Sequence, residues 1–169
     1  AACVVVNLFM LPDEPELFRQ CVRNIARVRA DCSRYGMPLM IEPLVMLPND
    51  VRGGYQVDGD AEKIVTLVRL AAEMGADIIK ADPTADPDDF HRVVEAARVP
   101  VLARGGGKED LRRVLDKSAA LVAQGARGLV YGRNIYQHAN PGAVVAALMA
   151  IIHKGADGAA AWEIYTHAV

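Results

Sequence analysis

Short apolar runs alternate along the chain with longer stretches that have helical periodicity. The first run covers residues 3–9 and is rich in β-branched side chains, which is typical of a buried strand. Residues 13–35 follow, with apolar positions three or four apart: Leu17, Cys21, Ile25, Val28 and Cys32. That spacing predicts a helix with one apolar face. The chain therefore opens with a strand and an amphipathic helix.

The same alternation returns four times. Further strands are predicted at 39–45, 77–80, 99–103 and 128–131, and further helices at 61–74, 86–97, 109–124 and 141–154. A loop rich in Pro, Gly and Asp is expected between 46 and 60, and a last helix near 159–167 is expected to pack on the outside. Strands that are apolar on both faces and alternate with helices require a parallel sheet covered by helices. The predicted fold class is α/β.

Chain length leaves two α/β architectures open. A (β/α)₈ barrel needs about 250 residues, and this chain has 169. It is therefore either an open, doubly wound sheet of five strands or the last five βα units of a TIM barrel. In both cases residues 1–169 are expected to form a single domain.

Composition excludes several classes of protein. Nineteen basic and 21 acidic residues give a net charge of -2, which argues against a nucleic-acid partner. No apolar run approaches the roughly 18 positions of a membrane-spanning helix. Three cysteines without CxxC spacing suggest buried thiols in a reducing compartment, so a cytoplasmic location is expected. The chain does not begin with Met, and we expect further residues before Ala1 in the natural gene product.

Lys80 ends the predicted strand 77–80, at the rim where parallel α/β folds bind their ligands. Apolar neighbours lower the proton affinity of an amine, and a free amine is what Schiff-base chemistry with a ketone or aldehyde requires. The structural alternative is that Lys80 solvates the strand end or pairs with Asp82.

Two consecutive loops carry glycines and a cation. Gly105 and Gly106 lie in the Arg-Gly-Gly-Gly-Lys run after the strand 99–103, and Gly132 with Arg133 follows the last strand. Glycines let backbone N–H groups approach an anion, although each loop by itself could be a structural turn. Barrel enzymes often bind phosphate between the loops after strands seven and eight. This match favours the barrel and places Lys80 on strand six.

Other polar residues have two interpretations each. Glu42, within an apolar strand, could move protons for a Schiff-base lysine or pair structurally with Arg52 or Arg104. Asn7, in the first strand, could hydrogen-bond a substrate hydroxyl or satisfy interior neighbours. The four histidines show no metal-binding spacing, so no metal site is expected, and His138 is expected in a capping or surface role. Asp86 before a proline fits a helix cap better than a calcium site.

Three segments carry a resemblance to a known family: GADIIKADPTADPDDFHRVV, VPVLARGGGK and GARGLVYGRNIYQHANPGAVVAALMAIIH. They resemble the C-terminal half of archaeal-type class I fructose-bisphosphate aldolases, and more closely the related enzyme that processes phosphorylated autoinducer-2. The resemblance implies a barrel with its Schiff-base lysine at Lys80 and a phosphate site at Gly105, Gly106, Gly132 and Arg133. It further implies a lyase that uses no metal or other cofactor, acts on a phosphorylated ketose or keto compound, and forms a homo-oligomer.

The chain also departs from the family pattern. It has no counterpart of the first three strands, whose loops include an acidic residue close to the lysine. Leu44 stands where the fructose-bisphosphate branch has a tyrosine, and Asp82 and Arg104 are unusual at their positions. Two alternatives therefore stay open: a coenzyme A-dependent thiolase or acyltransferase acting on a phosphorylated diketone, and a non-catalytic phosphate-binding or assembly subunit.

Overall fold

The fold is built on a parallel sheet whose strands lie side by side in chain order. A computed structural model describes residues 1–51 and 53–168. The strands are β1 (Val4–Met10), β2 (Leu39–Pro48), β4 (Ile78–Ala81), β5 (Val101–Arg104) and β6 (Gly128–Val130). Each is parallel to the next in the order β1-β2-β4-β5-β6. The predicted α/β class and all five predicted parallel strands are confirmed.

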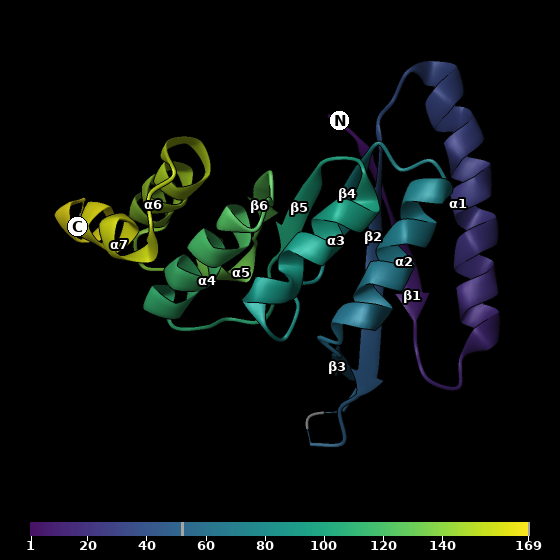
Figure 1. Cartoon of the computed structure of the whole chain (residues 1–169), viewed down its shortest axis with the longest axis horizontal. Coiled ribbons are helices and arrows are strands. Elements are labelled where there is room, and N and C mark those ends of the chain that lie inside the picture. The colour runs from purple at the N-terminus through teal and green to yellow at the C-terminus, as the bar shows by residue number, and fades with distance from the viewer. Residues whose placement is uncertain (52, 169) are drawn as a thin grey trace.

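This strand order decides between the two architectures. Right-handed crossovers that always step in the same direction place every connecting helix on the same face, whereas a doubly wound sheet reverses direction and covers both faces. Figure 1 shows the helices following one another in the order of the strands, from α1 at one end to α6 and α7 at the other. The sheet is therefore the arc of a (β/α)₈ barrel, and the doubly wound alternative is wrong.

The helices begin and end close to the predicted positions. They are α1 (Pro15–Tyr35), α2 (Ala61–Glu73), α3 (Phe90–Ala97), α4 (Leu111–Ala123), α5 (Arg133–Tyr136), α6 (Pro141–Lys154) and α7 (Gly158–His167). A short 3₁₀ turn, η1 (Pro87–Asp89), precedes α3. Asp86 caps this turn by accepting a hydrogen bond from the Asp88 N–H, with Pro87 in the first position. The expected capping role of Asp86 is confirmed.

One strand was not expected from the sequence. β3 (Tyr55–Val57) pairs antiparallel with Met46–Pro48 at the end of β2, inside the segment predicted as a loop. Tyr55 and Gln56 are exposed, so this short strand has no apolar periodicity by which the sequence could reveal it.

Two apolar clusters hold the helices in place. The larger lies between the sheet and α1 to α3 and includes Ile25, Leu67 and Phe90, each with no exposed surface. The smaller joins α4, α6 and α7, where Trp162 and Tyr165 pack against buried aliphatic side chains. The last helix therefore packs on the outside as predicted. No helix in the described part of the chain is long and apolar enough to cross a membrane.

Candidate functional site

Four charged side chains gather at the carboxyl ends of β4 and β5, beside the first half of β2. Glu42, Lys80 and Arg104 come from these three strands, and Asp82 directly follows β4. The adjacent residues Ile41, Ile79 and Ala103 have no exposed surface and belong to the core between sheet and helices. Because side chains alternate along a strand, the charged residues project from the opposite, inner face of the arc. That rim is where barrel enzymes place their chemistry.

Lys80 and Glu42 form a shielded ion pair between neighbouring strands. Nζ of Lys80 lies 3.0 Å from Oε2 of Glu42, and the two side chains are 19% and 10% exposed. The predicted alternative, a pairing of Lys80 with Asp82, is wrong. Lys80 pairs with Glu42, and Asp82 hydrogen-bonds to Arg104. An amine at a strand end, next to a carboxylate that can hold or release a proton, has the two groups that imine formation needs.

Arg104 lies between two carboxylates. Its Nε is 2.8 Å from Oε1 of Glu42, and its Nη1 is 2.6 Å from Oδ1 of Asp82. Arg104 as a structural partner of Glu42 is therefore confirmed, and the same carboxylate also faces Lys80. The other partner considered for Glu42, Arg52, lies outside the described residues.

Asp82 is the most deeply buried member of the cluster. Its side chain is 1% exposed, and its Oδ2 atom has no hydrogen-bond partner among the residues that the structure describes. Burial raises the pKa of this carboxyl, and the nearby guanidinium of Arg104 opposes that rise. The sequence marks Asp82 as an unusual residue and as a possible partner of Lys80, but it does not indicate the burial of this side chain.

Asn7 lies beside this cluster but does not join it. It is paired in register with Glu42 across β1 and β2. Its side chain is exposed, so the expected interior position is wrong. The reason is geometric: β1 is an edge strand, and the helices cover only its other face.

The glycines of the two phosphate-loop candidates have different roles. The Gly105 N–H donates to the carbonyl oxygen of Val130 at 3.0 Å, which extends the pairing of β5 with β6. That N–H is already in use and cannot also cradle a phosphate. The amides of Gly106 and Gly132 donate to no acceptor within 1–51 and 53–168 and remain candidates for an anion.

Asn134 ties the two loops together. Its Nδ2 donates to the Gly107 carbonyl oxygen at 3.0 Å, and its Oδ1 accepts from the Glu109 N–H at 2.9 Å. Arg133, next to it, is exposed and donates through Nη2 to the Gly106 carbonyl oxygen at 3.2 Å. The loops are thus joined as the phosphate-site prediction requires. Asn134 was missed because a single asparagine after a Gly-Arg pair gives no sign that its side chain is buried.

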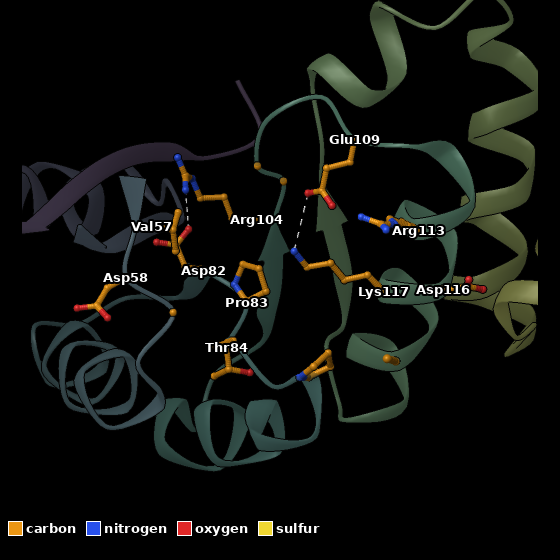
Figure 2. A pocket seen from close by; sticks show the side chains of 16 residues that line it. Val57, Asp58, Asp82, Pro83, Thr84, Arg104, Glu109, Arg113, Asp116 and Lys117 are labelled. Carbon is orange, nitrogen blue, oxygen red and sulfur yellow. Dashed lines mark hydrogen bonds and ion pairs between the residues drawn. The ribbon is translucent and has the colours of Figure 1, made fainter. Parts of the chain in front are cut away.

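A groove of about 670 Å³ extends from Asp82 and Arg104 to Gly105 and Gly106, and Lys80 and Glu42 are not among the residues that line it. Its lining includes Asp82, Thr84, Arg104, Gly106, Glu109 and Lys117. Figure 2 shows Asp82 and Arg104 pointing toward each other on one side, and Glu109 and Lys117 doing so on the other. A ligand in this groove would touch Asp82, Arg104 and the loop at Gly105 and Gly106.

The remaining polar candidates have structural roles. Nδ1 of His138 accepts from the Asn140 N–H at 3.1 Å, and the His138 ring packs edge-on against Tyr165. The cap of α6 is Asn140, whose side chain accepts from the Ala143 N–H, so the predicted capping role of His138 is not confirmed. In the described part of the chain, no three His, Cys, Asp or Glu side chains are arranged to hold a metal ion. That metal takes no part stays a prediction.

Comparison with known proteins places the chain in a family. The model of the DeoC/LacD family aldolases matches residues 1–138. A 2-amino-3,7-dideoxy-D-threo-hept-6-ulosonate synthase of Halobacterium salinarum is 37% identical over 140 residues, covering 83% of this chain and 51% of that protein. A 3-hydroxy-5-phosphonooxypentane-2,4-dione thiolase of Yersinia pestis is 33% identical over 166 residues, covering 98% and 53%.

Solved structures agree with the sequence relatives. An archaeal fructose 1,6-bisphosphate aldolase superposes with a TM-score of 0.78 at 27% identity, over 91% of this chain and 59% of that chain. A Schiff base-forming fructose-1,6-bisphosphate aldolase superposes equally well, at 28% identity over 90% and 59%. The chain spans about half the length of the curated relatives it matches. The resemblance found in the sequence is confirmed, and the chain belongs to the DeoC/LacD family of aldolases.

Proposed function

We propose that this chain carries the imine-forming lysine and the phosphate site of a metal-independent class I aldolase, a carbon-carbon lyase. The observation that carries the proposal is the contact between Lys80 and Glu42 at the inner rim of the barrel arc. The amine is mostly shielded from solvent and is held by a carboxylate whose second oxygen contacts Arg104, a residue that lines the groove reaching the glycine loop.

In the proposed reaction, the neutral amine of Lys80 attacks the substrate carbonyl, and the carbinolamine loses water to give a protonated imine. A base then takes the proton of the hydroxyl on the β-carbon. The carbon-carbon bond breaks with its electron pair moving into the imine, which releases an aldehyde and leaves an enamine. Protonation of the enamine carbon and hydrolysis return the free amine and the ketone. Glu42 is the candidate for these proton transfers because its Oε2 faces Nζ.

The phosphate of the substrate is proposed to bind at the two tied loops. The amides of Gly106 and Gly132 are open to an anion, and Arg133 supplies an exposed cation beside them. Gly105 supports this site by aligning the loop with β6 and does not donate to the phosphate itself.

Borohydride trapping tests the proposal. The full chain is incubated with dihydroxyacetone phosphate, reduced, digested and analysed by mass spectrometry, with Lys80→Ala as the test variant and Lys154→Ala as the control. We expect one adduct on the Lys80 peptide, lost in Lys80→Ala and kept in Lys154→Ala. Adducts spread evenly over all lysines, or none on folded protein, would contradict the aldolase role. Dihydroxyacetone without phosphate should be trapped more weakly, because it lacks the group that the loops bind.

A thiolase-type acyl transfer is the second candidate. The relative named as a thiolase aligns with 98% of this chain, and Leu44 stands where the fructose-bisphosphate branch has a tyrosine. In such a reaction coenzyme A would take the acyl group of a phosphorylated diketone. A requirement for coenzyme A in product formation, measured on the full chain with the diketone, distinguishes the two reactions. If Lys80 traps no ketone while the chain still binds phosphate, the third alternative, a non-catalytic phosphate-binding or assembly subunit, is favoured.

Three broader expectations belong with the proposal: a single domain over residues 1–169, a cytoplasmic location, and assembly into a homo-oligomer with neither nucleic acid nor membrane as partner. Size-exclusion chromatography with light scattering tests the assembly, and a monomer at micromolar concentration would contradict it.

A further inference from the structure

Asp82 has an unused acceptor. Among the residues that the structure describes, its Oδ2 is the one buried side-chain oxygen or nitrogen atom without a hydrogen-bond partner. Its Oδ1 accepts from Nη1 of Arg104 at 2.6 Å, and the whole side chain is 1% exposed. A buried acceptor without a partner destabilises the folded chain, because it has lost its hydrogen bonds to water and gained none in exchange. A donor brought by a ligand would remove this cost.

Arg104 has an unused donor edge beside that acceptor. Its Nε faces Oε1 of Glu42 and its Nη1 faces Asp82, whereas Nη2 donates to no acceptor in the described part of the chain. The two carboxylates hold the guanidinium in one orientation, and the side chain is 22% exposed. Asp82 and Arg104 together therefore offer one free acceptor and one accessible donor.

Both residues line the groove that reaches the glycine loop. Figure 2 shows Asp82, Pro83 and Thr84 following one another beside Arg104, and all four belong to the lining. Oδ2 itself has almost no exposed surface. The last torsion of an aspartate side chain is soft, so a small rotation of the carboxyl turns Oδ2 toward a ligand in the groove.

The chemistry of this pair favours a hydroxyl group over an ion. Lys80 and Arg104 are positive and Glu42 and Asp82 are negative, so their formal charges cancel and an ion gains no net attraction. A hydroxyl both donates and accepts hydrogen bonds. It can donate to Oδ2 of Asp82 and accept from Nη2 of Arg104 at the same time. A carbonyl can only accept and an ammonium can only donate, so each would leave one group of the pair unused.

We propose that Asp82 and Arg104 are specificity-determining residues that bind a hydroxyl group of the substrate. This assignment rests on the proposed function, because the substrate is taken to carry a phosphate that binds at the glycine loop. No covalent bond forms or breaks at the pair. A substrate without the hydroxyl leaves both groups unpaired, and sites built to hydrogen-bond a hydroxyl discriminate strongly against analogues that lack it. The site therefore selects hydroxylated phosphate esters.

Two unreactive phosphate esters test the assignment without imine chemistry. D-Arabitol 5-phosphate and pentyl phosphate have the same carbon chain length and the same phosphate, and they differ only in their hydroxyl groups. Neither has a carbonyl, so neither forms an imine with Lys80. Their binding to the full chain is measured by calorimetry. We expect the wild-type chain to bind arabitol 5-phosphate about tenfold more tightly than pentyl phosphate.

Two variants remove the pair from either side. Asp82→Ala deletes the acceptor and Arg104→Gln deletes Nη2, and each should reduce the preference for the polyol to about twofold or less. Pentyl phosphate does not use the pair, so its affinity should stay near the wild-type value and shows that the variant is folded. Arg113→Gln is the matched control. Arg113 lines the same groove from α4, and its side chain has no hydrogen bond or ion pair within the described residues, so this variant should keep the wild-type preference.

Equal affinity of the wild-type chain for the two esters would overturn the assignment, and this result does not depend on any variant. A preference that survives in both Asp82→Ala and Arg104→Gln would also overturn it, because other groups would then read the hydroxyl. Failure of the proposed function looks different: the chain still prefers arabitol 5-phosphate, but borohydride trapping gives no ketone adduct on Lys80.

Discussion

Gly105 packs directly against Tyr131. A Cβ atom built on Gly105 would lie 2.8 Å from Cδ1 and 3.2 Å from Cα of Tyr131; the first distance is shorter than Cβ contacts in proteins, and the second is tighter than most of them. Cα belongs to the backbone of the neighbouring loop, so rotation of the Tyr131 side chain would relieve only the shorter of the two contacts. The glycine is required by packing between the loops, whatever binds beside it.

Gly105→Ala is therefore expected to lower the free energy of unfolding by about 1 to 3 kcal/mol, because the loop after β5 must move away from Tyr131. Urea denaturation measures the change. Gly106→Ala is the matched control, since its Cβ would meet only Oε1 of Glu109, at 3.8 Å. Equal losses in the two variants would show that the close approach to Tyr131 is not the cause.

Asn134→Ala removes both hydrogen bonds that join the phosphate-loop candidates. The Glu109 N–H and the Gly107 carbonyl oxygen lose their partners, and we expect a loss of about 2 kcal/mol in unfolding free energy. Inorganic phosphate, titrated by calorimetry, should bind more weakly because the loops are no longer held together. Gln137→Ala, at an exposed position nearby, should change neither quantity. Phosphate binding of wild-type strength in Asn134→Ala would place the anion site elsewhere.

Tyr131→Phe tests the effect of a buried phenol on stability at alkaline pH. Burial raises the pKa of Tyr131, although its hydrogen bond with Ser118 acts in the opposite direction. Above the ordinary tyrosine pKa the unfolded chain loses this proton while the folded chain keeps it, so the phenol's contribution to stability falls as pH rises there. The variant should lose about 1 kcal/mol at neutral pH and less than that at alkaline pH.

Unfolding free energies measured from neutral to alkaline pH test the prediction for Tyr131→Phe. The difference between Tyr131→Phe and wild type must shrink as pH rises, whereas Tyr35→Phe, at a position that is 73% exposed, should show a difference that does not change with pH. A constant difference for Tyr131→Phe would contradict the raised pKa.

Asp82→Asn tests the corresponding effect on the acid side. Burial raises the pKa of Asp82, so from the ordinary aspartate value up to the raised one the folded chain binds the proton that the unfolded chain has lost. Wild-type stability therefore falls as pH rises through this window, and the variant lacks that contribution. The free energy of unfolding of Asp82→Asn should accordingly increase relative to that of wild type as pH rises through this window.

Denaturation series across the acidic range measure this relative change. Asp31→Asn, at an exposed position on α1 without an ion pair in the described part of the chain, is the matched control and should run parallel to wild type. If Asp82→Asn instead became less stable relative to wild type as pH rises, the effect of Arg104 on the pKa of Asp82 would exceed the effect of burial.

Periodicity alone predicted most of the fold, because buried strands and amphipathic helices repeat their apolar residues at short intervals. The strand over Tyr55–Val57 escaped detection because two of its three side chains are exposed and its pairing depends on the end of β2. Strand order was left open by the sequence, since both candidate sheets are made from the same strands and helices.

The candidate site residues also divide into those that the sequence could indicate and those that it could not. Lys80 and Glu42 could each be chosen from the sequence because a charged residue inside an apolar strand is unusual. Asn134 and Asp82 could not, because a short polar side chain in a loop carries no sign of its burial. The role of Gly105 was predicted wrongly for a similar reason: which of three consecutive glycines has a free N–H depends on where β6 lies.

By itself, therefore, the sequence determined the α/β class, the positions of the parallel strands, the candidate lysine and the aldolase resemblance, all of which depend on local pattern. The tertiary structure decided which residues contact one another. Lys80 meets a carboxylate 38 residues away because β2 and β4 are neighbours in the sheet, and Arg104 reaches that carboxylate and Asp82 from β5. Such contacts depend on strand order and register, which are set by the packing of the whole sheet and leave no pattern in a single stretch of chain.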